Sequence, residues 1–86
     1  MIFYHGTTES SWKKIQEEGI LFGIRKFAKS RCTYLTTDIN EAKQYGDIIL
    51  QIEYDPFKNP NMNNYIDEAW QCRVYEPILL KNIKKL

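Results

Sequence analysis

Short runs of apolar, β-branched and aromatic residues, broken by glycine, proline and polar turns, predict a chain built mainly of β-strands. The predicted strands are Met1–Tyr4, Cys32–Thr36, Ile48–Tyr54, Trp70–Tyr75 and Ile78–Leu80. The first should end at His5 and Gly6. Pro77 interrupts the strand Trp70–Tyr75, because proline cannot donate to a strand ladder, and pairing can resume at Ile78–Leu80. With helices between the early strands and strands dominating the second half, the pattern predicts an α+β fold.

A first helix is predicted directly after the first strand. Thr7 or Thr8 can cap its N-terminus, because a threonine hydroxyl accepts a hydrogen bond from one of the free N–H groups of the first turn. Trp12, Ile15 and Gln16 share one face of this helix. Gly19 is placed to end the helix in the left-handed conformation.

A second, shorter helix is predicted over Asn40–Tyr45. Asp38 and Glu41 have the spacing of a capping box at its start, and Gly46 ends it. A terminal turn of helix is predicted over Asn82–Leu86. Two further stretches are predicted as loops, namely the basic Gly23–Arg31 and the asparagine- and proline-rich Asp55–Asn64.

Composition narrows the class of protein. A chain of 86 residues predicts one small domain, residues 1–86. The net charge of +1 argues against a general electrostatic grip on nucleic acid. The aromatic fraction of 14% is high for so short a chain. Flat rings suit stacking against a planar ligand, and they also compensate for a thin core, so composition alone supports both interpretations.

Targeting and metal-binding signals are missing from the sequence. No apolar run approaches the roughly 18–20 residues of a membrane span, and the N-terminus lacks the pattern of a signal peptide. We therefore expect a cytoplasmic protein, of the producing or a host cell, with no membrane partner. Cys32 and Cys72 are expected to be reduced thiols. One histidine and two scattered cysteines fall short of a zinc site, so no metal is expected. A monomer is expected.

The candidate chemistry begins at Tyr4-His5-Gly6-Thr7. A histidine at a strand end followed by glycine places a polar ring beside main chain that a ligand can approach closely. Tyr34 and Tyr45 are separated by a predicted strand end and a short helix, so their rings can form two walls around an aromatic ligand. Each motif alone also fits a structural role, as a histidine beside a tight turn or as tyrosines of the core.

Together and in this order, the motifs resemble the ADP-ribosyltransferase superfamily. The likeness rests on HGT at residues 5–7, YLTTD at 34–38, A-x-x-Y at 42–45 and WQCRVYEPI at 70–78. It is strongest to the His–Tyr–Glu branch, which includes the poly- and mono-ADP-ribose polymerases and diphtheria-type toxins. The resemblance extends from Tyr4 to Ile83. It implies a compact form of that family's split β-sheet with two short helices and trimmed loops.

The resemblance also implies NAD as co-substrate and a role for each matching residue. His5 would bind the 2′-hydroxyl of the adenosine ribose, and Gly6 would hold the nicotinamide carboxamide through its main chain. Thr7 would support the adenine-side ribose. Tyr34 and Tyr45 would sandwich the nicotinamide ring.

The pyrophosphate of NAD is expected to be neutralised by the basic loop. That loop holds Arg25, Lys29 and Arg31, and the sequence does not distinguish which residue makes the contact. The opposing interpretation is a solvated loop without a ligand.

The sequence departs from the family at its glutamate position, which is occupied here by Gln71. A carboxylate there stabilises the positive charge that develops on the ribose as the glycosidic bond breaks. Glutamine keeps a hydrogen bond but has no charge. Asp67 or Glu68 could take the role if the register differs, whereas Glu76 would point to the opposite strand face. The alternatives are transfer without this carboxylate, a binding protein without turnover, or a change that inactivates a toxic protein.

Three functions follow from these observations. The leading one is a mono-ADP-ribosyltransferase that uses NAD to modify a macromolecular acceptor, protein or nucleic acid, as a small bacterial or phage effector. The second is a module that binds NAD, ADP-ribose or a related nucleotide without turnover. The third is an RNA 2′-phosphotransferase-like activity, which depends on several arginines in the cleft. A small domain with an accidental motif likeness remains the alternative to all three.

Overall fold

The computed structural model describes residues 1–23, 32–58, 63–66 and 69–86. The strands are β1 (Ile2–Thr7), β2 (Ile20–Leu21), β3 (Thr33–Thr36), β4 (Ile48–Glu53), β5 (Asn63–Ile66), β6 (Ala69–Val74), β7 (Ile78–Leu79) and β8 (Ile83–Lys85). The helices are α1 (Glu9–Glu18) and α2 (Ile39–Ala42), with 3₁₀ turns at Lys43–Tyr45, Pro56–Lys58 and Leu80–Asn82. Among the described residues this is an α+β fold with two short helices, as the sequence predicts.

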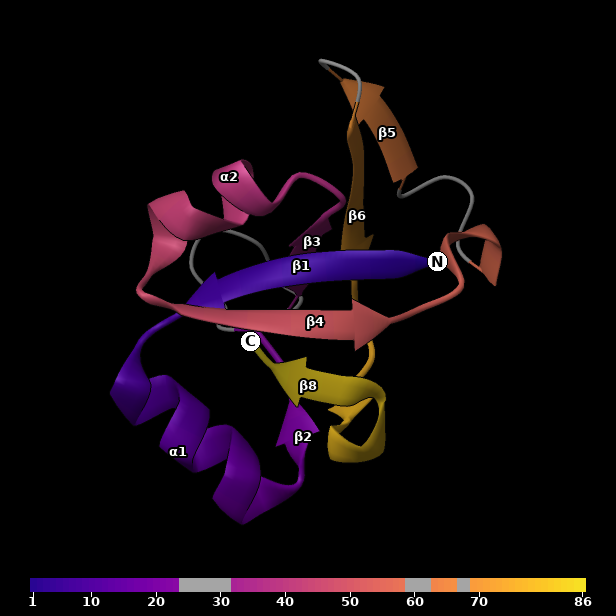
Figure 1. Cartoon of the computed structure of the whole chain (residues 1–86). Helices are drawn as coiled ribbons and strands as arrows, with labels where there is room; N and C mark the ends of the chain where they lie inside the picture. The colour runs from indigo at the N-terminus through magenta and orange to yellow at the C-terminus, as the bar shows by residue number, and fades with distance from the viewer. Residues whose placement is uncertain (24–31, 59–62, 67–68) are drawn as a thin grey trace.

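The main sheet is antiparallel, with the described strands in the order β5-β6-β3-β1-β4-β8. β2 and β7 pair separately as a two-stranded ribbon. Figure 1 shows α1 and α2 on either side of the β1–β4 pair. The first and last strands of the chain both flank β4, since β1 pairs along one edge of it and β8 along the other.

The central strand β1 pairs very differently with its two neighbours. Against β4 it is in register over its whole length, from Ile2 opposite Glu53 to Thr7 opposite Ile48. Against β3 the register joins one pair, Tyr4 with Thr36. Beyond that pair the two strands part, and the end of β1 and the start of β3 border a split in the sheet.

One face of the sheet carries the hydrophobic core. Five side chains on this face are completely buried, namely Phe3, Leu35, Leu50, Ile52 and Val74. Trp12 and Ile15 of α1 pack over them. Burying an aliphatic or aromatic side chain of this size contributes roughly 1.5–3 kcal/mol each. The alternation of buried residues along each strand therefore fixes which face receives α1.

The ends of α1 follow the predicted capping. The Thr8 hydroxyl accepts a hydrogen bond from the Ser11 N–H at 3.2 Å, so Thr8 is the N-cap. Gly19 ends the helix with φ of 75°, a left-handed conformation that suits glycine. The Gly19 N–H donates to the carbonyl of Ile15 at 2.8 Å. Both predicted boundaries of this helix are confirmed.

The opposite face of the sheet is covered near Gly6 by α2. The Asp38 side chain caps α2 by accepting from the N–H of Asn40 at 2.9 Å. A Cβ atom added to Gly6 would lie 1.8 Å from the carbonyl oxygen of Ala42. Glycine at this position therefore allows α2 to lie directly against β1.

Three predicted boundaries are wrong. The first strand continues through His5 and Gly6 to Thr7, because β4 offers pairing partners as far as Ile48. The last residues form β8 instead of a helical turn, because Ile83 pairs with Ile52 and packs against the core.

The loop predicted over Asp55–Asn64 contains a 3₁₀ turn and the first two residues of β5. Asn63 and Asn64 are paired there with β6, which overrides their preference for turns. The strand predicted at Ile78–Leu80 is present as β7 (Ile78–Leu79), which pairs with β2. The loop predicted over Gly23–Arg31 lies, after Gly23, outside the described residues.

The contact at Gly6 leads to a stability prediction. Gly6→Ala should lower the free energy of unfolding by about 2–3 kcal/mol, because the added methyl forces α2 away from β1. Gly19→Ala is the matched control, since nothing lies within 4 Å of its added Cβ and only the left-handed backbone is strained. We expect about 1 kcal/mol for it. Urea denaturation measures both, and an equal loss would contradict the close packing at Gly6.

Candidate functional site

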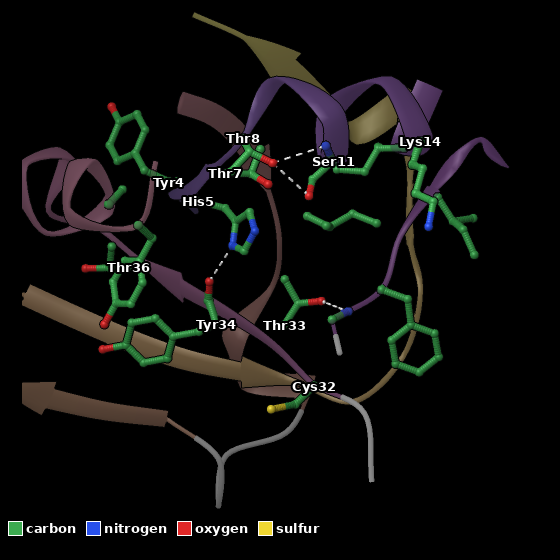
Figure 2. Close-up of a pocket in the computed structure, with 18 of the residues that line it drawn as sticks. Tyr4, His5, Thr7, Thr8, Ser11, Lys14, Cys32, Thr33, Tyr34 and Thr36 are labelled. Carbon is green, nitrogen blue, oxygen red and sulfur yellow. Dashed lines mark hydrogen bonds between the residues drawn. The ribbon is translucent and has the colours of Figure 1, made fainter. Parts of the chain in front are cut away.

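A cleft of about 710 Å³ lies at the split between β1 and β3. This volume falls in the range of roughly 300–1,000 Å³ typical of small-molecule sites. Its walls are the end of β1, the start of β3, one side of α1 and the turn carrying Tyr45. Figure 2 shows His5 reaching across this split toward Tyr34.

The ring of His5 is held by a hydrogen bond to β3, at a place where the main chains of β1 and β3 are not in register with each other. Its Nδ1 lies 2.9 Å from the main-chain carbonyl oxygen of Tyr34. Burial lowers the pKa of His5, and this outweighs the opposing effect of the bond to Tyr34. The ring is therefore neutral at pH 7. Because a carbonyl only accepts, the proton is on Nδ1, and Nε2 is left as a hydrogen-bond acceptor.

The main chain of Gly6 is directed into the cleft. Tyr54 N–H donates to the carbonyl of Met1 at 3.0 Å, so Met1 turns its main-chain groups toward β4. In an antiparallel strand these groups alternate sides, so Tyr4 and Gly6 turn theirs toward β3. Tyr4 is paired there with Thr36, but the register continues no further among the described residues. The N–H and C=O of Gly6 therefore face the split as one donor and one acceptor.

Tyr34 and Tyr45 lie next to each other at one end of the cleft. Their ring centroids are 6.2 Å apart and their planes are inclined by 53°. Burial raises the pKa of Tyr34, with further contributions from Tyr45 and Glu41, so its phenol stays protonated. A flat ring between two others needs about 7 Å between parallel planes. Tyr45, 58% exposed, would have to turn to complete such a sandwich.

The structure thus brings five of the predicted site residues to one cleft. They are His5, Gly6, Thr7, Tyr34 and Tyr45. Thr7 is buried at the β1 end of the wall.

Gln71 lies apart from these five residues. It is half-buried on β6, opposite Thr36, and is not among the residues that line the cleft. Thr36 also pairs with Tyr4. Gln71 therefore lies at the point where β1 and β3 are still paired, before the split between them begins. It nevertheless shares a sheet face with Tyr34, two residues before Thr36 on β3.

The remaining candidates are only partly described. Arg25 and Arg31 lie outside the described residues, although Gly23 and Cys32, which flank their segment in the sequence, both line the cleft. Asp67 and Glu68 also lie outside. Glu76 borders a different, smaller hollow.

Three polar residues of α1 line the cleft and were not predicted from the sequence. Ser11, Lys14 and Glu18 occupy positions i, i+3 and i+7, which share one side of a helix. Their spacing already places them on one side of the helix. The sequence does not show which side of the helix faces a cleft, because that depends on how the helix packs.

Comparisons with protein-family models, with curated proteins and with solved structures find no match to this chain. Within the described ranges, no helix is long and apolar enough to cross a membrane. The functional inference therefore rests on the geometry and chemistry of the cleft.

The lowered pKa of His5 predicts a pH-dependent stability. Above about pH 6.5 the ring is neutral in both folded and unfolded chains and contributes nothing. As the pH falls below 6.5, the unfolded chain binds the proton first, and the free energy of unfolding drops by at most about 1.4 kcal/mol per pH unit. Urea denaturation at pH 7.5 and 5.5 should show a larger drop for the unaltered protein than for His5→Gln.

The pKa itself can be read directly, because His5 is the only histidine of the chain. Its ring proton resonances, followed by NMR between pH 4.5 and 8, should give a midpoint below 6.5. A midpoint at or above that value would contradict the burial of the ring.

Proposed function

We propose that the protein is a mono-ADP-ribosyltransferase that binds NAD in the cleft between β1 and β3 and transfers ADP-ribose to a macromolecular acceptor. One observation carries the proposal. The open main chain of Gly6 stands beside the ring of Tyr34 and the acceptor nitrogen of His5. This combination suits an aromatic carboxamide joined to a hydroxyl-bearing sugar.

The nicotinamide ring matches one end of the cleft. Its carboxamide has one acceptor and one donor side, which the N–H and C=O of Gly6 complement. The ring would lie against Tyr34, and Tyr45 would turn over its other face.

His5 suits recognition of a ribose. The proton on Nδ1 is used in the bond to Tyr34, so Nε2 can only accept a hydrogen bond while the ring is neutral. A ribose hydroxyl donates such a bond, whereas a phosphate oxygen cannot. The role of His5 is therefore sugar binding and not phosphate binding.

In the proposed reaction, the bond between the ribose C1′ and the nicotinamide nitrogen breaks, and its electron pair stays with neutral nicotinamide. A nucleophilic atom of the acceptor bonds to C1′ and loses its proton to solvent or a nearby base. A carboxylate beside C1′ would stabilise the developing positive charge. Gln71 carries no charge and lies outside the cleft lining, so we expect slow transfer. A single electrostatic contact of this kind is worth about 10²–10³ in rate.

The same observation about Gln71 supports a second candidate, a module that binds NAD or ADP-ribose without turnover. The two functions share the binding residues and differ in whether nicotinamide is released. The RNA 2′-phosphotransferase alternative has weaker support. It depends on several arginines, and Lys14 is the one lysine or arginine among the described residues that line the cleft.

The first test is binding of NAD by isothermal titration calorimetry. His5→Ala and Tyr34→Ala should each reduce the affinity for NAD at least tenfold, because each removes a contact in the cleft. Tyr75→Ala is the matched control, since Tyr75 is exposed and does not line the cleft. Circular dichroism shows whether each variant stays folded. Unchanged NAD affinity in both folded cleft variants would remove the site assignment.

The second test is transfer of label from tagged NAD into a bacterial lysate, with the unaltered chain, Gln71→Glu and His5→Ala in parallel. We expect weak labelling of a discrete band by the unaltered chain and none by His5→Ala. Gln71→Glu should label more strongly if its carboxylate, on the same sheet face as Tyr34, reaches the ribose from beside the cleft. Label with Gln71→Glu alone would favour the binding module for the unaltered chain. No label from any variant would contradict the transferase.

A further inference from the structure

The wall of the cleft formed by α1 carries a sequence of polar groups. Ser11 and Lys14 are one turn apart, and Glu18 follows one turn later, so a hydroxyl, a cation and a carboxylate succeed one another over about 10 Å. The hydroxyl end lies next to Thr8, where α1 leaves β1. In Figure 2, the side chain of Lys14 extends from α1 along the edge of the cleft.

No carboxylate of the described residues forms an ion pair with the Lys14 ammonium. Within the described part of the chain, the one ion pair closer than 4 Å joins the N-terminal amine to Glu53 at 3.3 Å. Lys13 has the same charge, but it lies on another side of α1 and does not line the cleft. Lys14 is thus positioned for an anion that enters the cleft from solvent.

We propose that Lys14 binds the pyrophosphate of NAD, an assignment that rests on the proposed function. The pyrophosphate is the only anionic part of the dinucleotide, and a lysine ammonium binds phosphate as a point charge. Gly6 and Tyr34 hold the nicotinamide end, which places the two phosphates further along the cleft, beside α1. Glu18 repels them, so they lie on the Ser11 side of Lys14.

The far end of the cleft, past Lys14, suits an uncharged base. Ile20 and Phe22 line it with apolar surface, and Glu18 adds one carboxylate acceptor. A purine carrying an exocyclic amine can lie against such a surface and donate to that carboxylate. The α1 wall therefore selects a molecule of dinucleotide length over nicotinamide mononucleotide.

The experiment measures the affinities for NAD, nicotinamide mononucleotide and nicotinamide by calorimetry. Lys14→Gln should weaken binding of NAD ten- to hundredfold. It should leave nicotinamide within twofold, because that probe has no phosphate. Raising NaCl from 50 to 500 mM should weaken NAD binding to the unaltered protein and much less to the variant.

Two matched variants separate a contact from general electrostatics. Lys13→Gln removes the same charge from the adjacent residue of α1 and should leave NAD affinity unchanged. Lys14→Arg keeps the charge and should stay within a few fold of the unaltered protein. Thermal unfolding monitored by circular dichroism checks that α1 is intact in each.

Four outcomes would overturn the assignment. Equal losses for Lys13→Gln and Lys14→Gln would indicate a long-range charge effect. A loss of nicotinamide affinity in Lys14→Gln equal to the loss of NAD affinity would indicate damage to the cleft. Unaltered protein that binds neither NAD nor nicotinamide would refute the proposed function as well, whereas normal NAD binding by Lys14→Gln would refute the lysine assignment alone.

Discussion

The rest of the molecule depends on one constraint in the main sheet. Strands β1 and β3 pair at Tyr4 and Thr36, and this pairing does not continue to Gly6 and Tyr34. Before this point β1 and β3 belong to one sheet, and after it they border a cleft. Leaving a main-chain donor or acceptor without a partner costs about 1–3 kcal/mol where water is excluded. The bond from His5 to the Tyr34 carbonyl recovers part of that cost and links the two strands across the split. The cleft is thus built into the sheet.

Local signals in the sequence were sufficient for the elements whose structure is decided locally. The Thr8 cap, the left-handed Gly19 and the Asp38 cap depend on neighbours within a few residues, and all three could be predicted. The C-terminal strand could not, because residues 83–85 are extended only through their pairing with β4. The same holds for β5, whose pairing with β6 outweighs the turn preference of its asparagines.

The candidate site likewise has features that the sequence predicted and features that it could not predict. Motif order indicated that His5, Gly6 and the two tyrosines belong together, and the structure brings them to one cleft. Two features could not be predicted. The interruption of the β1–β3 register opens the main chain of Gly6, and it is a property of two strands that are distant in sequence. The place of Lys14 in the cleft wall depends on the rotation of α1 about its axis, which Trp12 and Ile15 set by packing into the core.

The position of β4 also constrains how the sheet is assembled. One edge of β4 pairs with β1, near the start of the chain. Its other edge pairs with β8, which is made up of residues close to the end. Pairings between residues so far apart in sequence form slowly. Before residues 83–85 pair with it, the apolar strand Ile48–Glu53 has an unpaired edge, and a strand of another chain can pair there. A nascent or C-terminally truncated chain should therefore be the aggregation-prone species, and the two lysines of β8 discourage further strand addition once the sheet is complete.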